Sequence, residues 1–237
     1  MLLPIRVTTP EQDRRAAWRQ VGFQRPAARH LLVAVVAPAG VVALSFGTAW
    51  IFGVVGFPPP DEWALDEALN ILIGTAVFAV VILGEEIGWR GYLQPRLREL
   101  LPIKPASLVT GACHALFHLP LLLLTTNYQS EGSRWIVVPT VMVTLTLAGV
   151  WYGWLRSRSG SIWTVSLSHS TFNAAMESIG GVAIAGSVTT MAYVTTETGF
   201  VTLLVMVGLA GYLLSRPDRW WTVPQAVSQS SRDHRRR

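Results

Sequence analysis

Residues 68–90 read ALNILIGTAVFAVVILGEEIGWR, and this stretch carries the information that decides the fold. It opens as an apolar run of helical length, which predicts a membrane-spanning helix. The helical pattern then continues through three ionisable residues, Glu85, Glu86 and Arg90. Each ionisable group inside a span costs about 2.5–3.5 kcal/mol on insertion scales. Groups that are kept there need partners or a water-filled cavity, so the stretch predicts an intramembrane polar cavity.

The composition of the whole chain agrees with a membrane protein. The 237 residues are 51% hydrophobic and only 14% charged, with a mean hydropathy of +0.40, whereas a soluble domain carries about 25% charged residues. Because a spanning helix needs roughly 20 apolar residues, the length suits six or seven of them. We therefore expect an all-α fold, a polytopic membrane bundle of six to seven transmembrane helices. The net charge of +5 sits at the ends of apolar runs, which favours a role in membrane topology over nucleic-acid binding.

Six apolar runs mark the expected spans. They cover residues 31–57, 66–100, 106–124, 135–155, 162–179 and 200–214. Residues 180–196 are rich in Gly and Thr and are compatible with a short span, a re-entrant segment or a covering loop. The expected organisation is an N-terminal cytoplasmic segment of residues 1–30, a transmembrane domain of residues 31–215 and a basic cytoplasmic tail of residues 216–237.

The distribution of basic residues predicts the orientation of these spans. Arg and Lys gather in residues 1–30, 96–104, 156–158 and 216–237. All four groups fall on one side if the spans alternate, and the positive-inside rule makes that side cytoplasmic. The opposite side then holds mostly acidic residues, namely Asp61, Glu62, Asp66, Glu67 and Glu131, with Arg134. We expect a multi-pass protein of the cell membrane with both termini in the cytoplasm.

The segment Glu85-Glu86-Ile-Gly-Trp-Arg90 predicts different roles for its two carboxylates. Glu86 and Arg90 are spaced i,i+4 and share a helix face, so Arg90 can hold Glu86 ionised and fixed. Glu85 points about 100° away from Glu86 and is free to take a proton from water. The plain alternative is an ordinary ion pair at a polar helix end.

Two further i,i+4 pairs place polar side chains inside spans. His114 and His118 project from one face of the third run, and His169 and Asn173 from one face of the fifth. His169 and Asn173 can donate hydrogen bonds to one oxygen, as an oxyanion site requires. Taken separately, each pair is compatible with helix packing or interhelical hydrogen bonding. With the expected topology, however, Glu85, His118 and His169 lie in the same half of the bilayer, which favours a single cavity.

Other hydrolytic chemistries find less support in the sequence. Cys113 is the only cysteine, so no intrachain disulfide is possible, and its mostly apolar neighbours do not favour a nucleophile. Ser168 and Ser170 are too close in sequence to His169 to form a separate nucleophile and base. Zinc ligation by three His and a Glu stays open, since His114 and His118 have a suitable spacing. The usual His-Glu-x-x-His metalloprotease motif is absent from the sequence.

The three segments, in this order, resemble the motifs of the CAAX prenyl protease and bacteriocin-processing (CPBP, or Abi) family of intramembrane endopeptidases. The family's Glu-Glu-x-x-x-Arg is matched by residues 85–90, its aromatic-x-x-x-His by residues 114–118 and its His-x-x-x-Asn by residues 169–173. The resemblance extends over about residues 66–179. One position departs from it, because the second motif usually begins with Phe or Trp and here begins with His114.

The resemblance implies a glutamate-type mechanism carried by three pairs of residues. These are Glu85 with His118, which activate a water; His169 with Asn173, which stabilise the oxyanion; and Glu86 with Arg90, which organise the first pair. The expected function is thus an intramembrane endopeptidase acting on a peptide or protein substrate in the lipid bilayer. No cofactor is expected, with zinc as the open variant. The alternative is a non-catalytic membrane immunity or scaffold protein, or a small proton-coupled transporter.

Overall fold

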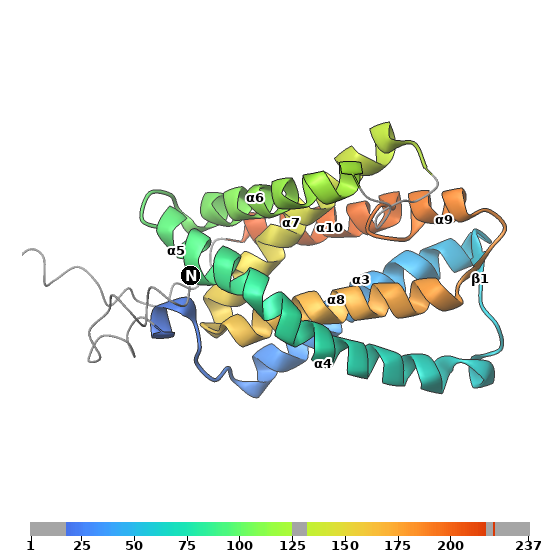
Figure 1. Cartoon of the computed structure of the whole chain (residues 1–237), viewed down its shortest axis with the longest axis horizontal. Coiled ribbons are helices and arrows are strands. Elements are labelled where there is room, and N and C mark those ends of the chain that lie inside the picture. The colour runs from blue at the N-terminus through green and yellow to red at the C-terminus, as the bar shows by residue number, and fades with distance from the viewer. Residues whose placement is uncertain (1–17, 125–131, 217–219, 221–237) are drawn as a thin grey trace, which may run out of the picture.

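The computed structural model describes residues 18–124, 132–216 and 220, and this part of the chain is almost entirely helical (Figure 1). The main elements, in chain order, are α3 (Ala28–Ile51), β1 (Val55–Gly56), the 3-10 turn η1 (Pro60–Glu62), α4 (Ala64–Gly88), the π-helical turn η2 (Trp89–Leu93), α5 (Gln94–Leu97), α6 (Ile103–Leu124), α7 (Arg134–Ser159), α8 (Ile162–Val182), β2 (Ile184–Ala185), α9 (Val188–Val194) and α10 (Phe200–Ser215). A helix lies at each of the six expected spans, so the all-α prediction is confirmed.

Within residues 18–124 and 132–216, four helical segments are long and apolar enough to cross a membrane. They are Ala28–Ile51, Ala64–Leu97, Ile103–Leu124 and Arg134–Ser159. In the described residues, α10 is apolar but has only 16 residues, and α8 is long but carries many Ser and Thr side chains. Buried hydroxyl groups explain why α8 is less apolar, because it packs inside the bundle against both α3 and α4.

The continuation of the second run beyond its apolar part is confirmed. The chain stays helical from Ala64 to Leu97, through α4, η2 and α5. The turn between α4 and α5 is π-helical at Trp89–Leu93, a wider turn that rotates the side chains after it. Such turns are frequent at functional sites, and this one begins directly before Arg90. It also contacts both α6 and α7, which brings Arg90 to the centre of the bundle.

Residues 180–196 form no membrane-spanning helix. Ile184–Ala185 pair antiparallel with Val55–Gly56, which ties the end of α8 to the end of α3 (Figure 1). The helix that follows, α9, has seven residues, too few to cross a bilayer. Of the three structures that the sequence left open for this segment, the described residues exclude a complete span.

The packing of α6 on α7 fixes the position of the two histidines on α6. Gly111 and Gly149 lie against each other at the crossing, and a Cβ on Gly111 would meet the Thr146 carbonyl oxygen at 2.4 Å. One turn away, a Cβ on Gly153 would meet the Ser107 side chain. Because neither backbone carries a side chain at the crossing, α6 approaches α7 closely, and the next turn of α6 presents His114 to the bundle interior.

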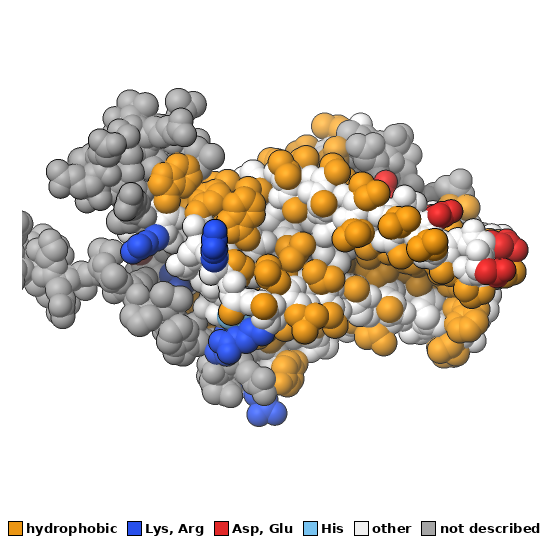
Figure 2. Space-filling model, turned by 90° about the horizontal axis from the view of Figure 1, so that it is seen from below, with side chains coloured by type: hydrophobic (Ala, Val, Ile, Leu, Met, Phe, Trp, Pro, Cys, Tyr) orange, Lys and Arg blue, Asp and Glu red, His pale blue; other side chains and the backbone are white. Residues whose placement is uncertain are grey.

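The surface separates into three zones along the molecule. In Figure 2, Lys and Arg gather at one end, Asp and Glu at the other, and hydrophobic side chains cover the length between them. At the basic end, residues before α3 are attached to the turn between α7 and α8: the Ile162 amide donates to the Gly22 carbonyl (2.9 Å), and Arg156 Nη2 donates to the Gln20 carbonyl (3.0 Å). An apolar belt between two charged ends of opposite sign is the surface expected of a membrane protein.

Candidate active site

The end of α4 and the π-helical turn supply the central ion pair of the site. Arg90 Nη1 lies 3.0 Å from Glu86 Oε1 and 3.1 Å from Oε2, and neither side chain is exposed to solvent (both 0%). The i,i+4 spacing predicted this pairing, and the structure confirms it. Leaving either charge alone in such an interior would be costly, so the pair is a fixed part of the bundle.

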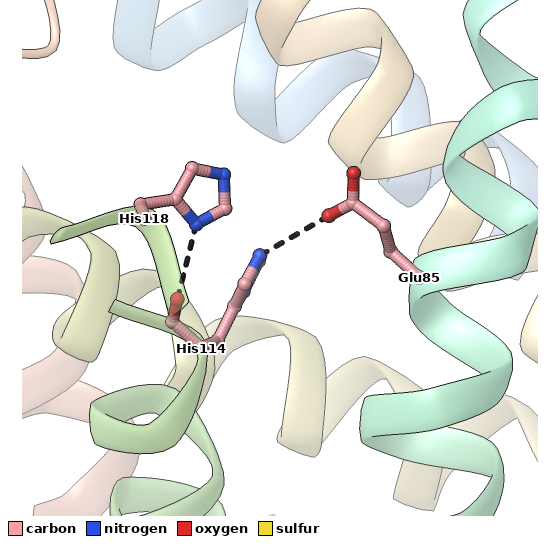
Figure 3. A group of neighbouring side chains, drawn as sticks. All are labelled: Glu85, His114 and His118. Atoms are coloured by element: carbon pink, nitrogen blue, oxygen red, sulfur yellow. Dashed lines mark hydrogen bonds and ion pairs between the residues drawn. The ribbon is translucent and has the colours of Figure 1, made fainter. Parts of the chain in front are cut away.

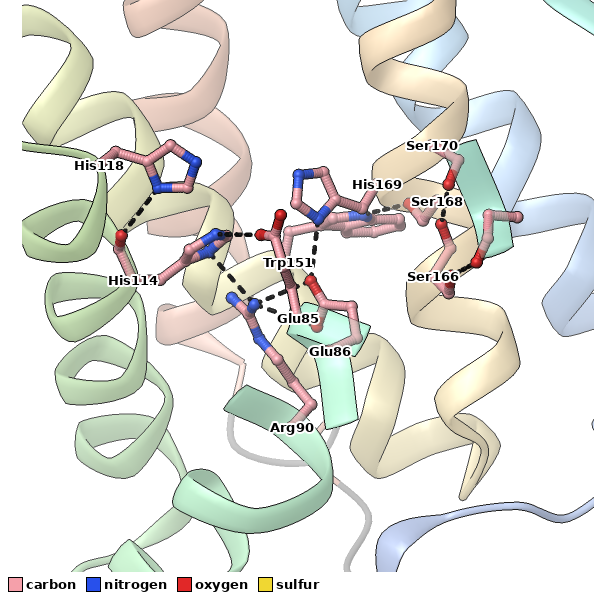
Figure 4. A network of polar contacts seen from close by, with 11 residues as sticks. Glu85, Glu86, Arg90, His114, His118, Trp151, Ser166, Ser168, His169 and Ser170 are labelled. Carbon is pink, nitrogen blue, oxygen red and sulfur yellow. Dashed lines mark hydrogen bonds and ion pairs between the residues drawn. The ribbon is translucent and has the colours of Figure 1, made fainter. Parts of the chain in front are cut away.

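Glu86 also receives a hydrogen bond from α8. His169 Nδ1 lies 2.9 Å from Glu86 Oε1, and since a carboxylate only accepts, the Nδ1 nitrogen carries the hydrogen. The Tyr152 ring of α7 stacks on the His169 ring at 5.1 Å between centroids, and the Arg90 guanidinium lies over the same Tyr152 ring at 4.9 Å. We call Glu86, Arg90, His169 and Tyr152 the closed half of the site; Figure 4 labels the first three.

Glu85, His114 and His118 form a second group, which we call the open half (Figure 3). The Glu85 side chain is 34% exposed, and its Oε2 atom lies 3.4 Å from His114 Nε2. His118 Nδ1 lies 3.0 Å from the His114 carbonyl oxygen, so it donates its hydrogen there. In a neutral ring the other nitrogen of His118, Nε2, therefore holds a lone pair.

His114 joins the two halves. His114, which is buried, has its Nδ1 atom 3.3 Å from Arg90 Nη1 (Figure 4). Its ring also lies 5.6 Å from the His169 ring and 4.9 Å from the His118 ring, centroid to centroid. The residue at which the sequence departs from the family's second motif thus sits at the centre of the polar cluster.

Five of the six expected site residues meet in this cluster, and Asn173 does not join it by a hydrogen bond. Asn173 lies one turn beyond His169 on α8 and is half-buried, and it makes no hydrogen bond to another residue in the described part of the chain. The i,i+4 spacing gives it the same helix face as His169, but the structure supplies no partner for its carboxamide.

The open half has a composition that suits a divalent metal. Glu85, His114 and His118 each offer one ligand atom, and these atoms all lie within 4.8 Å of one another. A carboxylate oxygen and imidazole nitrogens are common zinc ligands. The zinc variant stays a prediction.

Sequence reasoning missed the aromatic residues that support the site. Tyr152 holds His169 and Arg90 on its ring, and Trp89 lies against His114 at 5.2 Å. Trp151 donates from Nε1 to Ser168 Oγ at 2.9 Å, which fixes α7 to α8 behind the site. A buried Tyr or Trp needs a partner for its polar atom, so aromatic residues deep in the fourth run were a usable signal, but the sequence does not show which face they occupy.

Comparison with known proteins agrees with this geometry. Residues 67–175 match the family model described as type II CAAX prenyl endopeptidase Rce1-like. The matched segment includes α4, α6, α7 and most of α8, and so contains all six expected site residues. No curated protein matches the chain. The family match and the apolar helices together make this a multi-pass membrane protein. Over residues 67–175, the chain is therefore similar to the Rce1-like type II CAAX prenyl endopeptidases.

Proposed function

We propose that the protein is an intramembrane endopeptidase that hydrolyses a peptide bond with a water activated between Glu85 and His118. The observation that carries the proposal is the different environment of two adjacent carboxylates. Glu86 is closed in by Arg90 and His169, whereas Glu85 is 34% exposed. A general base must reach its water, and in this cluster only the open half offers a carboxylate that can.

The histidine hydrogen bonds give each ring a part in the reaction. Because His118 donates from Nδ1 to a backbone carbonyl, its Nε2 lone pair can accept one hydrogen of the water while Glu85 accepts the other. Glu85 takes the proton as the hydroxide attacks the peptide carbonyl, and it then passes that proton to the leaving amine. The tetrahedral intermediate that forms carries a negative oxygen.

His169 and Asn173 are the proposed donors to that oxygen. Since the Nδ1 hydrogen of His169 is directed at Glu86, His169 can donate from Nε2 only as an imidazolium. The Glu86 carboxylate lies 2.9 Å from this ring, and the Tyr152 ring stacks on it at 5.1 Å between centroids. The Asn173 carboxamide, which is not engaged by a described residue, would add a neutral donor. Preorganised donors of this kind contribute about 10²–10³-fold to the rate.

We further propose a six-helix topology with both termini in the cytoplasm. α8 and α10 would complete the four longer apolar helices, with α8 shielded from lipid by its neighbours. Two observations support this topology: residues 20–24 attach to the α7–α8 turn, and the surface has a basic end with an acidic end opposite (Figure 2). The proposed divisions remain residues 1–30, 31–215 and 216–237; most of the first and nearly all of the last lie outside the described residues.

Loss of the Glu85 carboxylate tests the catalytic proposal. We expect Glu85→Ala to reduce peptide hydrolysis by at least about 10²-fold, because the water loses its base, while the protein still inserts and unfolds at the wild-type temperature. The assay is cleavage of prenylated and unprenylated CAAX peptides by protein in liposomes, followed by mass spectrometry. Glu62→Ala, which removes an exposed carboxylate in η1, before the start of α4, is the matched control. Retained cleavage in Glu85→Ala would end the mechanism.

Chelation separates the zinc variant from the metal-free mechanism. We expect activity to survive dialysis against a chelator, and elemental analysis of the purified protein to find less than stoichiometric metal. The non-catalytic alternative finds no support in the family match. Proton-coupled flux through liposomes without any peptide cleavage would favour it.

A further inference from the structure

His114 touches both halves of the site through its two ring nitrogens. Nδ1 lies 3.3 Å from Arg90 Nη1, and Nε2 lies 3.4 Å from Glu85 Oε2 (Figure 4). In the described part of the chain, neither His114 Nε2 nor Glu85 Oε2 has another hydrogen-bond partner. The two atoms face each other across a gap slightly longer than a strong hydrogen bond (Figure 3).

The arginine contact determines which nitrogen of His114 carries the hydrogen. A guanidinium has five donors and no acceptor, so Arg90 can only donate to His114 Nδ1. Nδ1 must then hold a lone pair, and the single hydrogen of the neutral ring lies on Nε2, directed at Glu85. A doubly protonated ring would instead place a second cation, with its own N–H group, against Arg90.

We propose that His114 is a positioning residue that holds Glu85 through an Nε2–H donor and ties it to the Arg90–Glu86 ion pair. This inference rests on the proposed function, in which Glu85 is the base. The donor points the Glu85 carboxylate toward His118. His114 does this from the position where the family's second motif has an aromatic residue, so it is a feature of this chain.

The same tautomer opposes zinc ligation by His114. To bind a metal through Nε2, the ring would have to carry its hydrogen on Nδ1, where it would meet the Arg90 N–H group at 3.3 Å. His118 is different, because its Nδ1 hydrogen already goes to a carbonyl and its Nε2 is unprotonated in the neutral ring. The positioning role and a three-ligand zinc site therefore require opposite tautomers of one ring, which makes them experimentally separable.

The first experiment reads the tautomer without any assay of activity. The full chain, labelled with ¹⁵N-histidine and reconstituted in lipid, is studied by solid-state NMR, and His114→Gln identifies the His114 signals by their loss. We expect a neutral ring protonated at Nε2, unchanged when ZnCl₂ is added. A ring protonated at Nδ1, or a zinc-induced shift of the Nε2 signal, would overturn the proposal.

The second experiment compares two substitutions that separate hydrogen bonding from packing. A Gln carboxamide can accept from Arg90 and donate to Glu85, whereas Phe can pack against Trp89 but does neither. We expect His114→Phe to lower kcat by about 10- to 100-fold with little change in KM, because misplacing a reactive group by about 1 Å can cost about 10²-fold in rate. His114→Gln, which keeps both hydrogen bonds, should stay within about threefold of wild type.

The outcomes distinguish this proposal from the proposed function. If His114→Phe is as active as wild type, or if His114→Gln fails as badly as His114→Phe, then His114 does not act as a donor to Glu85. If the wild-type protein cleaves no peptide, the proposed function fails, and the tautomer measured by NMR alone decides whether His114 joins Arg90 to Glu85.

Discussion

Glu85 and Glu86 are neighbours in the chain, yet they belong to two very different regions of the site. Glu86 is fully buried and has two partners, Arg90 at 3.0 Å and His169 at 2.9 Å. Glu85 is 34% exposed and has one long contact, to His114 at 3.4 Å. A rotation of about 100° between consecutive helical residues produces this difference. It suggests that one carboxylate serves as part of the scaffold so that the other can remain accessible.

The largest effect is expected from removing Arg90, the cation of the closed half. We expect Arg90→Ala to destabilise the protein by about 3–5 kcal/mol, because the Glu86 charge would be left buried without its partner. Unfolding by SDS in mixed detergent micelles measures this loss. The same experiment on Glu85→Ala should show a change of under about 1 kcal/mol, since that carboxylate is partly exposed.

A double variant tests whether the unpaired charge of Glu86 causes this loss of stability. Glu86→Gln combined with Arg90→Met removes both charges and keeps similar volumes, and it should recover much of the stability without restoring hydrolysis. If Arg90→Ala unfolds like wild type, the closed half does not support the bundle, and the contrast between the two carboxylates loses its basis.

A second substitution is expected to disturb the open half alone. Gly111 lies one turn before His114 on α6, and a Cβ there would meet the Thr146 carbonyl oxygen at 2.4 Å. Gly111→Ala should push α6 away from α7 and cost about 1–3 kcal/mol, the usual range for overpacking. α6 carries His114 and His118 but no residue of the closed half. We therefore expect the loss of hydrolysis rate, expressed as a free energy, to exceed the loss in the free energy of unfolding.

Gly84→Ala is the matched control for this prediction. Gly84 is also helical and directly precedes Glu85, but a Cβ there meets no atom within 4 Å. The control should therefore be neutral or slightly stabilising, since Ala favours a helix over Gly by about 1 kcal/mol. Equal effects of the two substitutions would show that the α6–α7 crossing does not position the open half.

Helical spacing made much of this site predictable from the sequence. The i,i+4 rule placed Arg90 beside Glu86 and put His114 and His118 on one face, and both arrangements are present. The helices themselves followed from apolar runs, with ends that differ by a few residues. The first helix, for example, stops at Ile51, and the predicted run continued to Phe57 because Val55–Gly56 are apolar but extended.

Contacts between helices were much harder to predict. Nothing in the local pattern shows that Tyr152 would lie between Arg90 and His169, since that depends on how α7 is rotated about its axis. Asn173, on α8, has no hydrogen-bond partner among the described residues although its spacing matches that of His169. The ring nitrogens of His114 are a further example, because their roles follow from an arginine 24 residues away.

The smallest effect on stability is expected at the Arg96–Glu99 ion pair, although its atoms lie closer together than those of the Arg90–Glu86 pair. Arg96 Nη1 lies 2.8 Å from Glu99 Oε1, closer than Arg90 lies to Glu86, but the two side chains are 60% and 56% exposed. Exposed pairs contribute about 0.2–1 kcal/mol because water and salt screen the charges. Arg96→Ala should therefore shift the free energy of unfolding by under about 1 kcal/mol and leave hydrolysis unchanged. The same SDS titration used for Arg90→Ala decides this, and equal losses in both variants would mean that burial is not what separates the two ion pairs.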